Sequence, residues 1–197
     1  MIRWTTPLVI AGLILAAGCA SPDNRAPDES QSVAENWGQR GIVEIAVLPV
    51  SSEVPEETIP DKAFTFPEDE ARHQMRTYLI RERDYAVPTS AFVDQSDPKA
   101  VPVDAELTLV MEQWDSSRLQ QRGVVYAGGR FTLRAKGTGE ELWTYGCRDK
   151  QISVPAPHGG YAVEANMRDA SLEFVRQALS RLPRKTDFDA KMGGAAR

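Results

Sequence analysis

The sequence predicts an α/β domain with a mixed sheet, built from a βαβ unit, an antiparallel three-stranded meander and a C-terminal helix. Three observations lead to this prediction. An aliphatic run is followed by apolar residues at helical spacing, three alternating segments come next with turn residues between them, and a second helical repeat follows. The 197-residue chain is large enough for one such domain with its own hydrophobic core.

The first predicted strand is the aliphatic run at residues 41–50, which is typical of a strand buried on both faces. Residues 51–66 follow as a loop rich in Pro and Glu that is longer than most connections. Such a loop could contact a partner, or its aromatic residues Phe64 and Phe66 could cover the sheet. We favour the second interpretation, because leaving two Phe side chains in water is unfavourable.

The first predicted helix spans residues 67–83. Pro67 suits its first turn, the acidic residues after it face the positive end of the helix dipole, and apolar residues repeat at helical spacing. His73 falls on the opposite, solvated face of this helix. Residues 85–87 then predict a short second strand parallel to the first, which completes a βαβ unit.

The meander is predicted from alternating residues at 105–114, 124–135 and 142–154. This pattern places Cys147 on the buried face, and Gly128–Gly129 inside a strand indicates a bulge or a close backbone approach. The other face of the sheet is polar, and we expect cross-strand ion pairs there rather than a docking surface. Its charged residues are Glu106, Glu112, Arg130, Arg134 and Arg148.

The C-terminal helix is predicted between residues 163 and 182, where apolar residues recur at helical spacing until Pro183 ends the pattern. Residues 41–183 therefore form the predicted globular domain. Residues 184–197 are polar and small, and we expect them to be a disordered tail.

The N-terminus carries a targeting signal. Arg3 precedes an apolar run at residues 8–19 that ends in small residues and Cys19. Its last four residues, Ala-Ala-Gly-Cys, resemble the lipobox of bacterial lipoproteins. That resemblance implies cleavage between Gly18 and Cys19, so that residues 1–18 are a signal peptide and Cys19 carries a covalent lipid. The alternative, an uncleaved membrane helix, needs about 20 apolar residues, and the run at residues 7–20 is shorter.

Residues 19–40 are predicted to be a flexible tether behind the lipid, because they are polar and have little to bury. The net charge of −5 argues against a nucleic-acid partner and against electrostatic binding to anionic lipids. If Cys19 is lipidated, Cys147 has no intramolecular disulfide partner and cysteines cannot build a metal cluster. We therefore expect no cofactor besides the lipid.

Three segments carry a further resemblance: residues 45–50, residues 104–109 with Trp114, and residues 137–143. In this order, with a lipobox, they resemble a family of bacterial envelope lipoproteins of unknown function whose domain is like the N-terminal domain of TolB. More distantly they resemble the penicillin-binding-protein activator LpoB and the curli-secretion lipoprotein. The resemblance covers residues 42–183 and implies a periplasmic, non-catalytic domain that acts through an envelope protein partner. Since the relatives include ring-forming proteins, it leaves homo-oligomerisation open.

An enzyme would need a nucleophile beside a base, and the candidates are Cys147, His73 and His158. Cys147 is predicted to be buried, His73 lies on a surface helix, and His158 has no nucleophile beside it in the sequence. We therefore expect an adaptor without catalytic residues. A small-ligand-binding protein and a hydrolase using His158 are the alternatives. Ala20 after the lipidated cysteine favours the outer membrane over the inner one in the lipoprotein class.

Overall fold

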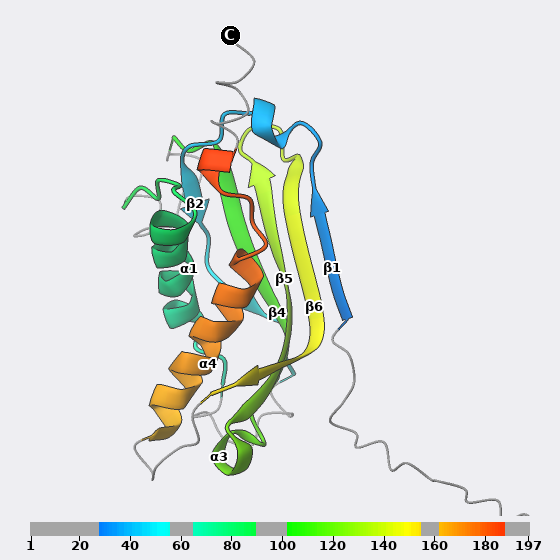
Figure 1. Ribbon diagram of the computed structural model, residues 1–197, viewed down its shortest axis with the longest axis vertical. Coiled ribbons are helices and arrows are strands. Elements are labelled where there is room, and N and C mark those ends of the chain that lie inside the picture. Colours follow the sequence, from blue (N-terminus) through cyan, green and yellow to red (C-terminus); the bar gives the residue numbers. More distant parts are fainter. Residues whose placement is uncertain (1–27, 56–64, 90–101, 155–161, 188–197) are drawn as a thin grey trace, which may run out of the picture.

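The computed structural model describes residues 28–55, 65–89, 102–154 and 162–187. The predicted signal peptide, Cys19, Ile59, Phe64 and His158 lie outside the described residues. Within them the chain forms one open sheet with helices on one side (Figure 1).

The sheet is mixed, as predicted. Its order is β1-β6-β5-β4-β2, and β3 also pairs with β4. β2 and β3 run parallel to β4, whereas the β4–β5, β5–β6 and β1–β6 pairs are antiparallel. The strands are β1 (Asp28–Val33), β2 (Ile45–Val47), β3 (Ser51–Ser52), β4 (Ala105–Asp115), β5 (Val124–Ala135) and β6 (Glu141–Ser153).

Two long helices, α1 (Glu68–Glu82) and α4 (Ala162–Leu179), lie side by side over one face of the sheet (Figure 1). They confirm the two helices predicted from the sequence. Two short elements complete the described chain: the 3₁₀ helix η1 (Trp37–Gln39) before β2, and α3 (Leu119–Arg122) between β4 and β5. Gly123 ends α3 at φ 64°, a left-handed conformation that favours glycine.

The core lies between the sheet and the two long helices. Alternate residues of β4 point into it, and Leu107 and Leu109 are fully buried. Phe131 of β5 lies 5.6 Å from Phe174 of α4, measured between ring centroids. Phe66 packs edge-on against Trp114 at 4.8 Å, which confirms that this part of the loop at residues 51–66 covers the core.

The open face of the sheet carries the predicted ion pairs. Glu112 and Arg130 approach to 3.5 Å across neighbouring strands, and Arg134 lies 2.6 Å from Glu141. Glu106 pairs with Lys136 at 3.6 Å. These side chains are partly or largely exposed, so each pair contributes little to stability.

The predicted strand at residues 85–87 is reduced to one parallel bridge between Ala86 and Glu44. The longer parallel neighbour of β2 is β4, so the predicted βαβ arrangement is not confirmed. Tyr85 and Val87 are buried, and their apolar character serves packing rather than a sheet ladder. Pro88, which has no backbone N–H, follows directly.

The tether predicted at residues 19–40 is wrong for its second half. Residues 28–33 form β1, and Trp37 in η1 is only 2% exposed. The predicted disordered tail is also corrected at its start, since residues 185–187 form a helical turn. The backbone N–H of Lys185 donates to the carbonyl of Arg83 at 3.1 Å.

The predicted irregularity at Gly128–Gly129 is confirmed. The β5–β6 register shifts between Ala127 and Gly129, and a Cβ on Gly129 would lie 2.8 Å from the carbonyl oxygen of Val110. The β4 register shifts beside it, between Met111 and Gln113. Beyond these bulges the strands curve towards the lower end of the helices (Figure 1).

Candidate functional site

The residues singled out from the sequence do not meet in one site. Cys147 is buried in β6, where its Sγ lies 4.0 Å from the carbonyl oxygen of Gly129. Burial raises the pKa of the Cys147 thiol, so the thiolate needed for nucleophilic attack is disfavoured. His73 lies on the exposed side of α1, whereas Cys147 lies beneath the helix layer. The described residues contain no group of His, Cys, Asp and Glu able to hold a metal ion.

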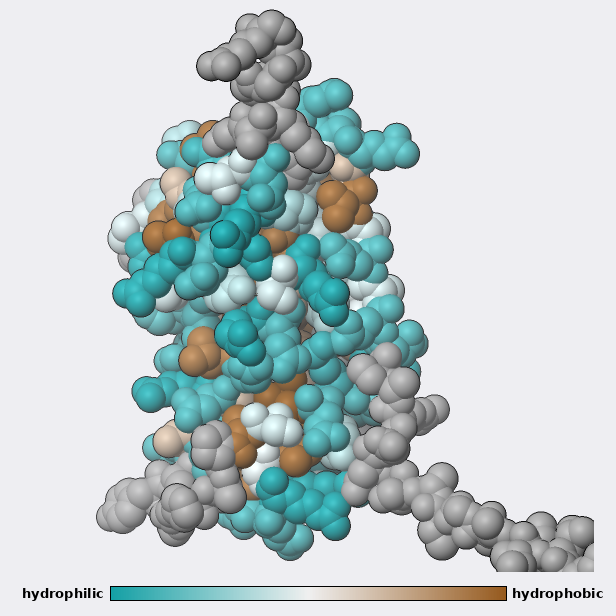
Figure 2. All heavy atoms as spheres, in the orientation of Figure 1, coloured by the Kyte–Doolittle hydropathy of each residue, from teal (hydrophilic) through white to brown (hydrophobic). Residues whose placement is uncertain are grey.

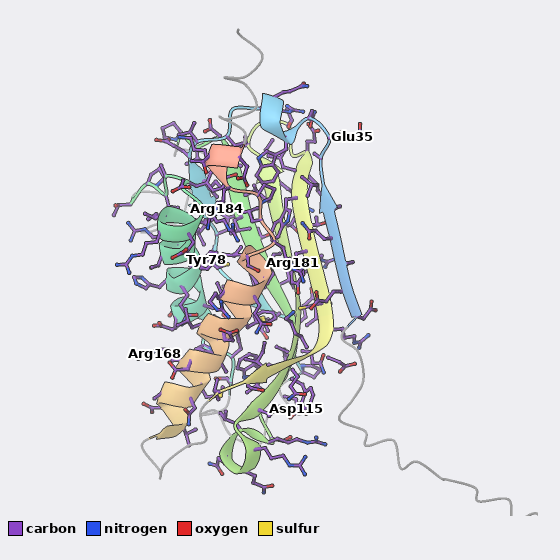
Figure 3. The ribbon with its side chains drawn as sticks, in the orientation of Figure 1. Glu35, Tyr78, Asp115, Arg168, Arg181 and Arg184 are labelled. Carbon is purple, nitrogen blue, oxygen red and sulfur yellow. The ribbon has the colours of Figure 1, made fainter. Side chains whose placement is uncertain are left out.

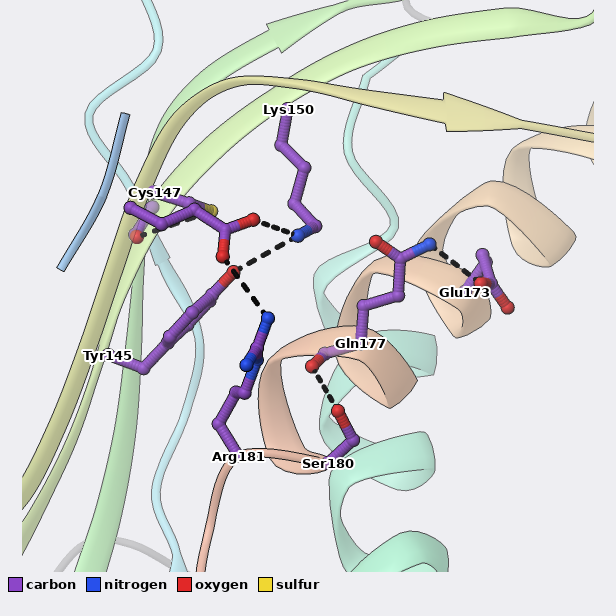
Figure 4. A network of polar contacts seen from close by, with 9 residues as sticks. Tyr145, Cys147, Lys150, Glu173, Gln177, Ser180 and Arg181 are labelled. Carbon is purple, nitrogen blue, oxygen red and sulfur yellow. Dashed lines mark hydrogen bonds and ion pairs between the residues drawn. The ribbon is translucent and has the colours of Figure 1, made fainter. Parts of the chain in front are cut away.

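The structure does bring together a polar cluster at the β1 edge of the sheet, which we call the β1 clamp: Glu29, Tyr145, Lys150 and Arg181 (Figure 4). The carboxylate of Glu29 forms an ion pair with Lys150 Nζ. Lys150 Nζ also donates to the Tyr145 hydroxyl at 3.2 Å. Arg181 lies just beyond α4 and approaches Glu29 to 3.6 Å (Figures 3 and 4).

The electrostatics of the β1 clamp favour the charged form of Glu29. The hydrogen bond from Lys150 is the main cause that lowers the pKa of Glu29, and Arg181 adds to it. The Lys150 side chain is only 12% exposed, so the pair is partly shielded from water. Burial raises the pKa of Tyr145, so its hydroxyl stays protonated. The cluster therefore suits holding a carboxylate rather than moving a proton.

Two further contacts fasten β1. Gln31 Nε2 donates to the carbonyl oxygen of Arg181 at 3.0 Å, on the same side of the strand as Glu29. On the opposite side the hydroxyls of Ser32 and Thr144 lie 2.5 Å apart. The six residues of β1 pair with β6 along their whole length, yet all six are exposed. β1 is thus held mainly by polar contacts and backbone pairing, and none of its side chains is fully buried, although the Glu29 side chain is only 25% exposed.

Arg83 fixes the position from which Arg181 reaches the β1 clamp. Its side chain is nearly buried, and it donates to the carbonyl oxygens of Leu179 at 2.9 Å and Ser180 at 2.6 Å. Leu179 is the last residue of α4 and Ser180 follows it, so both carbonyls lie at the end of the helix, where intrahelical donors run out. The Leu179 carbonyl also accepts the backbone N–H of Leu182 at 3.1 Å. The Tyr85 hydroxyl also donates to the carbonyl of Pro183 at 3.1 Å.

Sequence reasoning missed the β1 clamp because its members are far apart in the chain. Glu29 and Lys150 are separated by 121 residues. The polar sequence of β1 also lacks the alternation that indicates a half-buried strand. The one signal available was Trp37, an aromatic residue too apolar for a solvated tether.

A second feature is a groove of about 430 Å³ between the outer sides of α1 and α4. Beneath it the buried side chains of Gln74 and Ser171 form a 3.1 Å hydrogen bond between the helices. The groove is lined by both signs of charge and by the exposed Leu172. Tyr78 and Arg168 face it from the two helices (Figure 3). The surface on this side is mostly hydrophilic, with apolar residues in small spots (Figure 2).

No helix among the described residues combines the length and the apolar character that crossing a bilayer requires. No protein-family model matches the chain, and no curated protein is significantly similar to it in sequence.

Several solved structures resemble the fold at low sequence identity. The PelC dodecamer from Paraburkholderia phytofirmans is 14% identical with a TM-score of 0.49, and the match covers 81% of this chain and 99% of that one. A protein from Xanthomonas campestris is 10% identical with a TM-score of 0.46, covering 81% and 94%. A lipoprotein from Neisseria meningitidis is 17% identical with a TM-score of 0.39, covering 68% and 99%. Likenesses of this size define neither a family nor a function for this chain.

Proposed function

We propose that the chain is a lipid-anchored, non-catalytic accessory protein of the bacterial cell envelope, which presents its domain to an envelope protein partner in the periplasm. One observation carries this proposal: the apolar run at residues 8–19 ends in Ala-Ala-Gly-Cys, the pattern of a lipoprotein processing site. Several acyl chains on Cys19 would anchor the protein firmly, since each buried methylene contributes about 0.8 kcal/mol.

The fold supports an anchored domain with a defined orientation. β1 begins only nine residues after Cys19, which gives a maximum span of about 30 Å. β1 points away from the α3 end of the molecule and towards η1, so Asp28 is its residue nearest to the α3 end (Figure 1). This end would face the membrane, and the opposite end, with η1 and residues 185–187, would face away from it.

The non-catalytic assignment rests on the candidate residues themselves. Cys147 is a buried, protonated thiol, and His73 lies on the exposed side of a helix. A Cys–His enzyme needs a thiolate within hydrogen-bond reach of its base. The β1 clamp binds a carboxylate of the chain itself, which is a structural rather than a chemical task.

Lipid attachment is tested by metabolic labelling with an alkyne analogue of palmitate in the native host. The wild-type protein and a Cys147→Ser control should both incorporate the label and sediment with membranes, whereas Cys19→Ser should remain unlabelled and unprocessed. Label on Cys19→Ser, or none on the wild type, would contradict the proposal.

The accessory role is tested by crosslinking in intact membranes followed by purification. We expect the wild type to recover one or more specific envelope proteins, and Cys19→Ser to lose them because it no longer reaches the membrane. Recovery of only the protein itself would favour a homo-oligomer. Separation of the two membranes by density would show whether Ala20 does direct the protein to the outer one.

A further inference from the structure

The N-terminal part of the chain is attached to the domain at two successive points, one exposed and one buried. β1 comes first, and none of its six side chains is buried. Trp37 follows four residues after β1 ends, and it is 2% exposed and part of the core. No residue of β1 belongs to the buried core, whereas Trp37 does.

The contacts that hold β1 are mainly polar and lie at the edge of the sheet, where water competes with most of them, although the Glu29–Lys150 pair is partly shielded. Its residues include Asp, Glu, Ser and Gln, which have little preference for strands. Hydrogen bonds that are exchanged with water on folding contribute only modestly to stability. Val33, the apolar side chain of β1, is 43% exposed, so apolar burial adds little to them. Segments of this kind open locally at far lower free energy than the core unfolds.

We propose that β1 is a releasable strap that sets how far the domain reaches from the membrane and which end faces it. This inference rests on the proposed lipid at Cys19. With β1 paired, nine residues span the gap to the domain, about 30 Å at most. With β1 released, the first fixed residue is Trp37, eighteen residues after Cys19, and the maximum span doubles to about 60 Å.

Release would also change the orientation of the domain. β1 pairs with residues 143–148 of β6 and points from the side of the α3 end towards the η1 end (Figure 1). While β1 is paired, the chain enters at the α3 end and holds that end towards the membrane. Once it is released, the chain enters at the η1 end, and the α3 end is free to turn away.

The β1 clamp is the fastening of the strap. Glu29 lies on the helix side of β1, and its carboxylate is held by Lys150 and Arg181 from two other parts of the chain. A Glu29→Gln substitution keeps the size of the side chain and removes its charge, so Lys150 and Arg181 lose their ion pair with this side chain. Glu112→Gln is a matched control, because Glu112 also pairs with an arginine but lies on β4.

The first experiment measures amide hydrogen exchange of the full lipidated protein in vesicles. We expect residues 28–33 to exchange at least tenfold faster than Trp37 and β5, and Glu29→Gln to raise the β1 rate several-fold while leaving the rates of Trp37 and β5 unchanged. Glu112→Gln should match the wild type. The strap is overturned if β1 exchanges only together with β5, or if Glu29→Gln behaves like the control.

The second experiment measures reach, by energy transfer from a fluorophore on an unnatural amino acid at Gln121 in α3 to acceptor lipids. Glu29→Gln should lower the transfer, because the α3 end leaves the membrane. Ser30 pairs with Gly146, so Ser30→Cys and Gly146→Cys, in a Cys147→Ala background, should form a disulfide that holds β1 on β6. In the Glu29→Gln protein this disulfide should restore high energy transfer until it is reduced. Equal transfer in all variants would refute the strap, whereas absence of the protein from vesicles would instead refute the lipid anchor.

Discussion

Replacing Arg83 with alanine should destabilise the domain by about 2–4 kcal/mol. From a nearly buried position, Arg83 donates two hydrogen bonds at the C-terminal end of α4, to the carbonyls of Leu179 at 2.9 Å and Ser180 at 2.6 Å. Hydrogen bonds from charged groups contribute about 1.5–3 kcal/mol each, and two from one side chain are not fully additive. The substitution leaves both carbonyls without this donor and also removes the guanidinium that lies 5.6 Å from the Tyr78 ring centroid.

The assay is urea unfolding of the full-length protein in detergent, followed by tryptophan fluorescence and circular dichroism. For a chain of this size, the expected loss corresponds to a fall in melting temperature of roughly 4–16 °C. Arg81→Ala is the control, because Arg81 is exposed in the last turn of the same helix and should change stability by less than about 0.5 kcal/mol. Arg83→Lys should fall between the two, since a lysine cannot reproduce the two-pronged geometry. Equal midpoints for Arg83→Ala and Arg81→Ala would refute the capping role.

Gly129→Ala should destabilise the domain by about 1–3 kcal/mol, because its Cβ would lie 2.8 Å from the Val110 carbonyl oxygen. Gly146→Ala should cause a smaller loss of stability in the same urea assay, because its Cβ would meet only the flexible Ser30 hydroxyl at 3.0 Å. Phe66→Ala should cost about 3–5 kcal/mol because it leaves a cavity in an aromatic cluster. Acid should release β1 before the core unfolds. The pKa of Glu29 is held below its ordinary value of 4.5, so Glu29 is charged and paired at neutral pH. The stability that this pairing gives to β1 is lost as the pH falls through the lowered pKa. Limited proteolysis between pH 7 and pH 3 would show this, and simultaneous loss of β1 and the core would contradict it.

The parts of the fold that were predicted from the sequence are those that bury side chains periodically. β4 alternates buried and half-exposed residues, and α4 repeats its apolar residues at helical spacing. Such patterns can be recognised from neighbouring residues alone, because the apolar or polar character of each residue indicates whether it faces the core or water. The glycine pair in β5 was informative for a related reason. Two residues without side chains inside a strand allow a neighbouring strand's backbone to approach closely.

The parts that were not predicted depend on contacts between distant segments. β1 is a strand because β6 offers it an edge, and its polar sequence carries no sign of this. The β1 clamp needs Arg181, which is placed by the cap that Arg83 forms on α4. Conversely, residues 85–87 have the apolar composition of a strand but use it to fill the core, and only Ala86 pairs with β2's neighbour Glu44.

The central claim is that the mature protein begins at Cys19 and is held to the membrane by lipid on that residue. Intact-mass and peptide mass spectrometry of protein purified from native membranes tests it most directly. We expect an N-terminal peptide that starts at Cys19 and carries the mass of covalent acyl groups. A peptide that retains Gly18, or one with an unmodified thiol at Cys19, would show that the protein is not lipidated in this way.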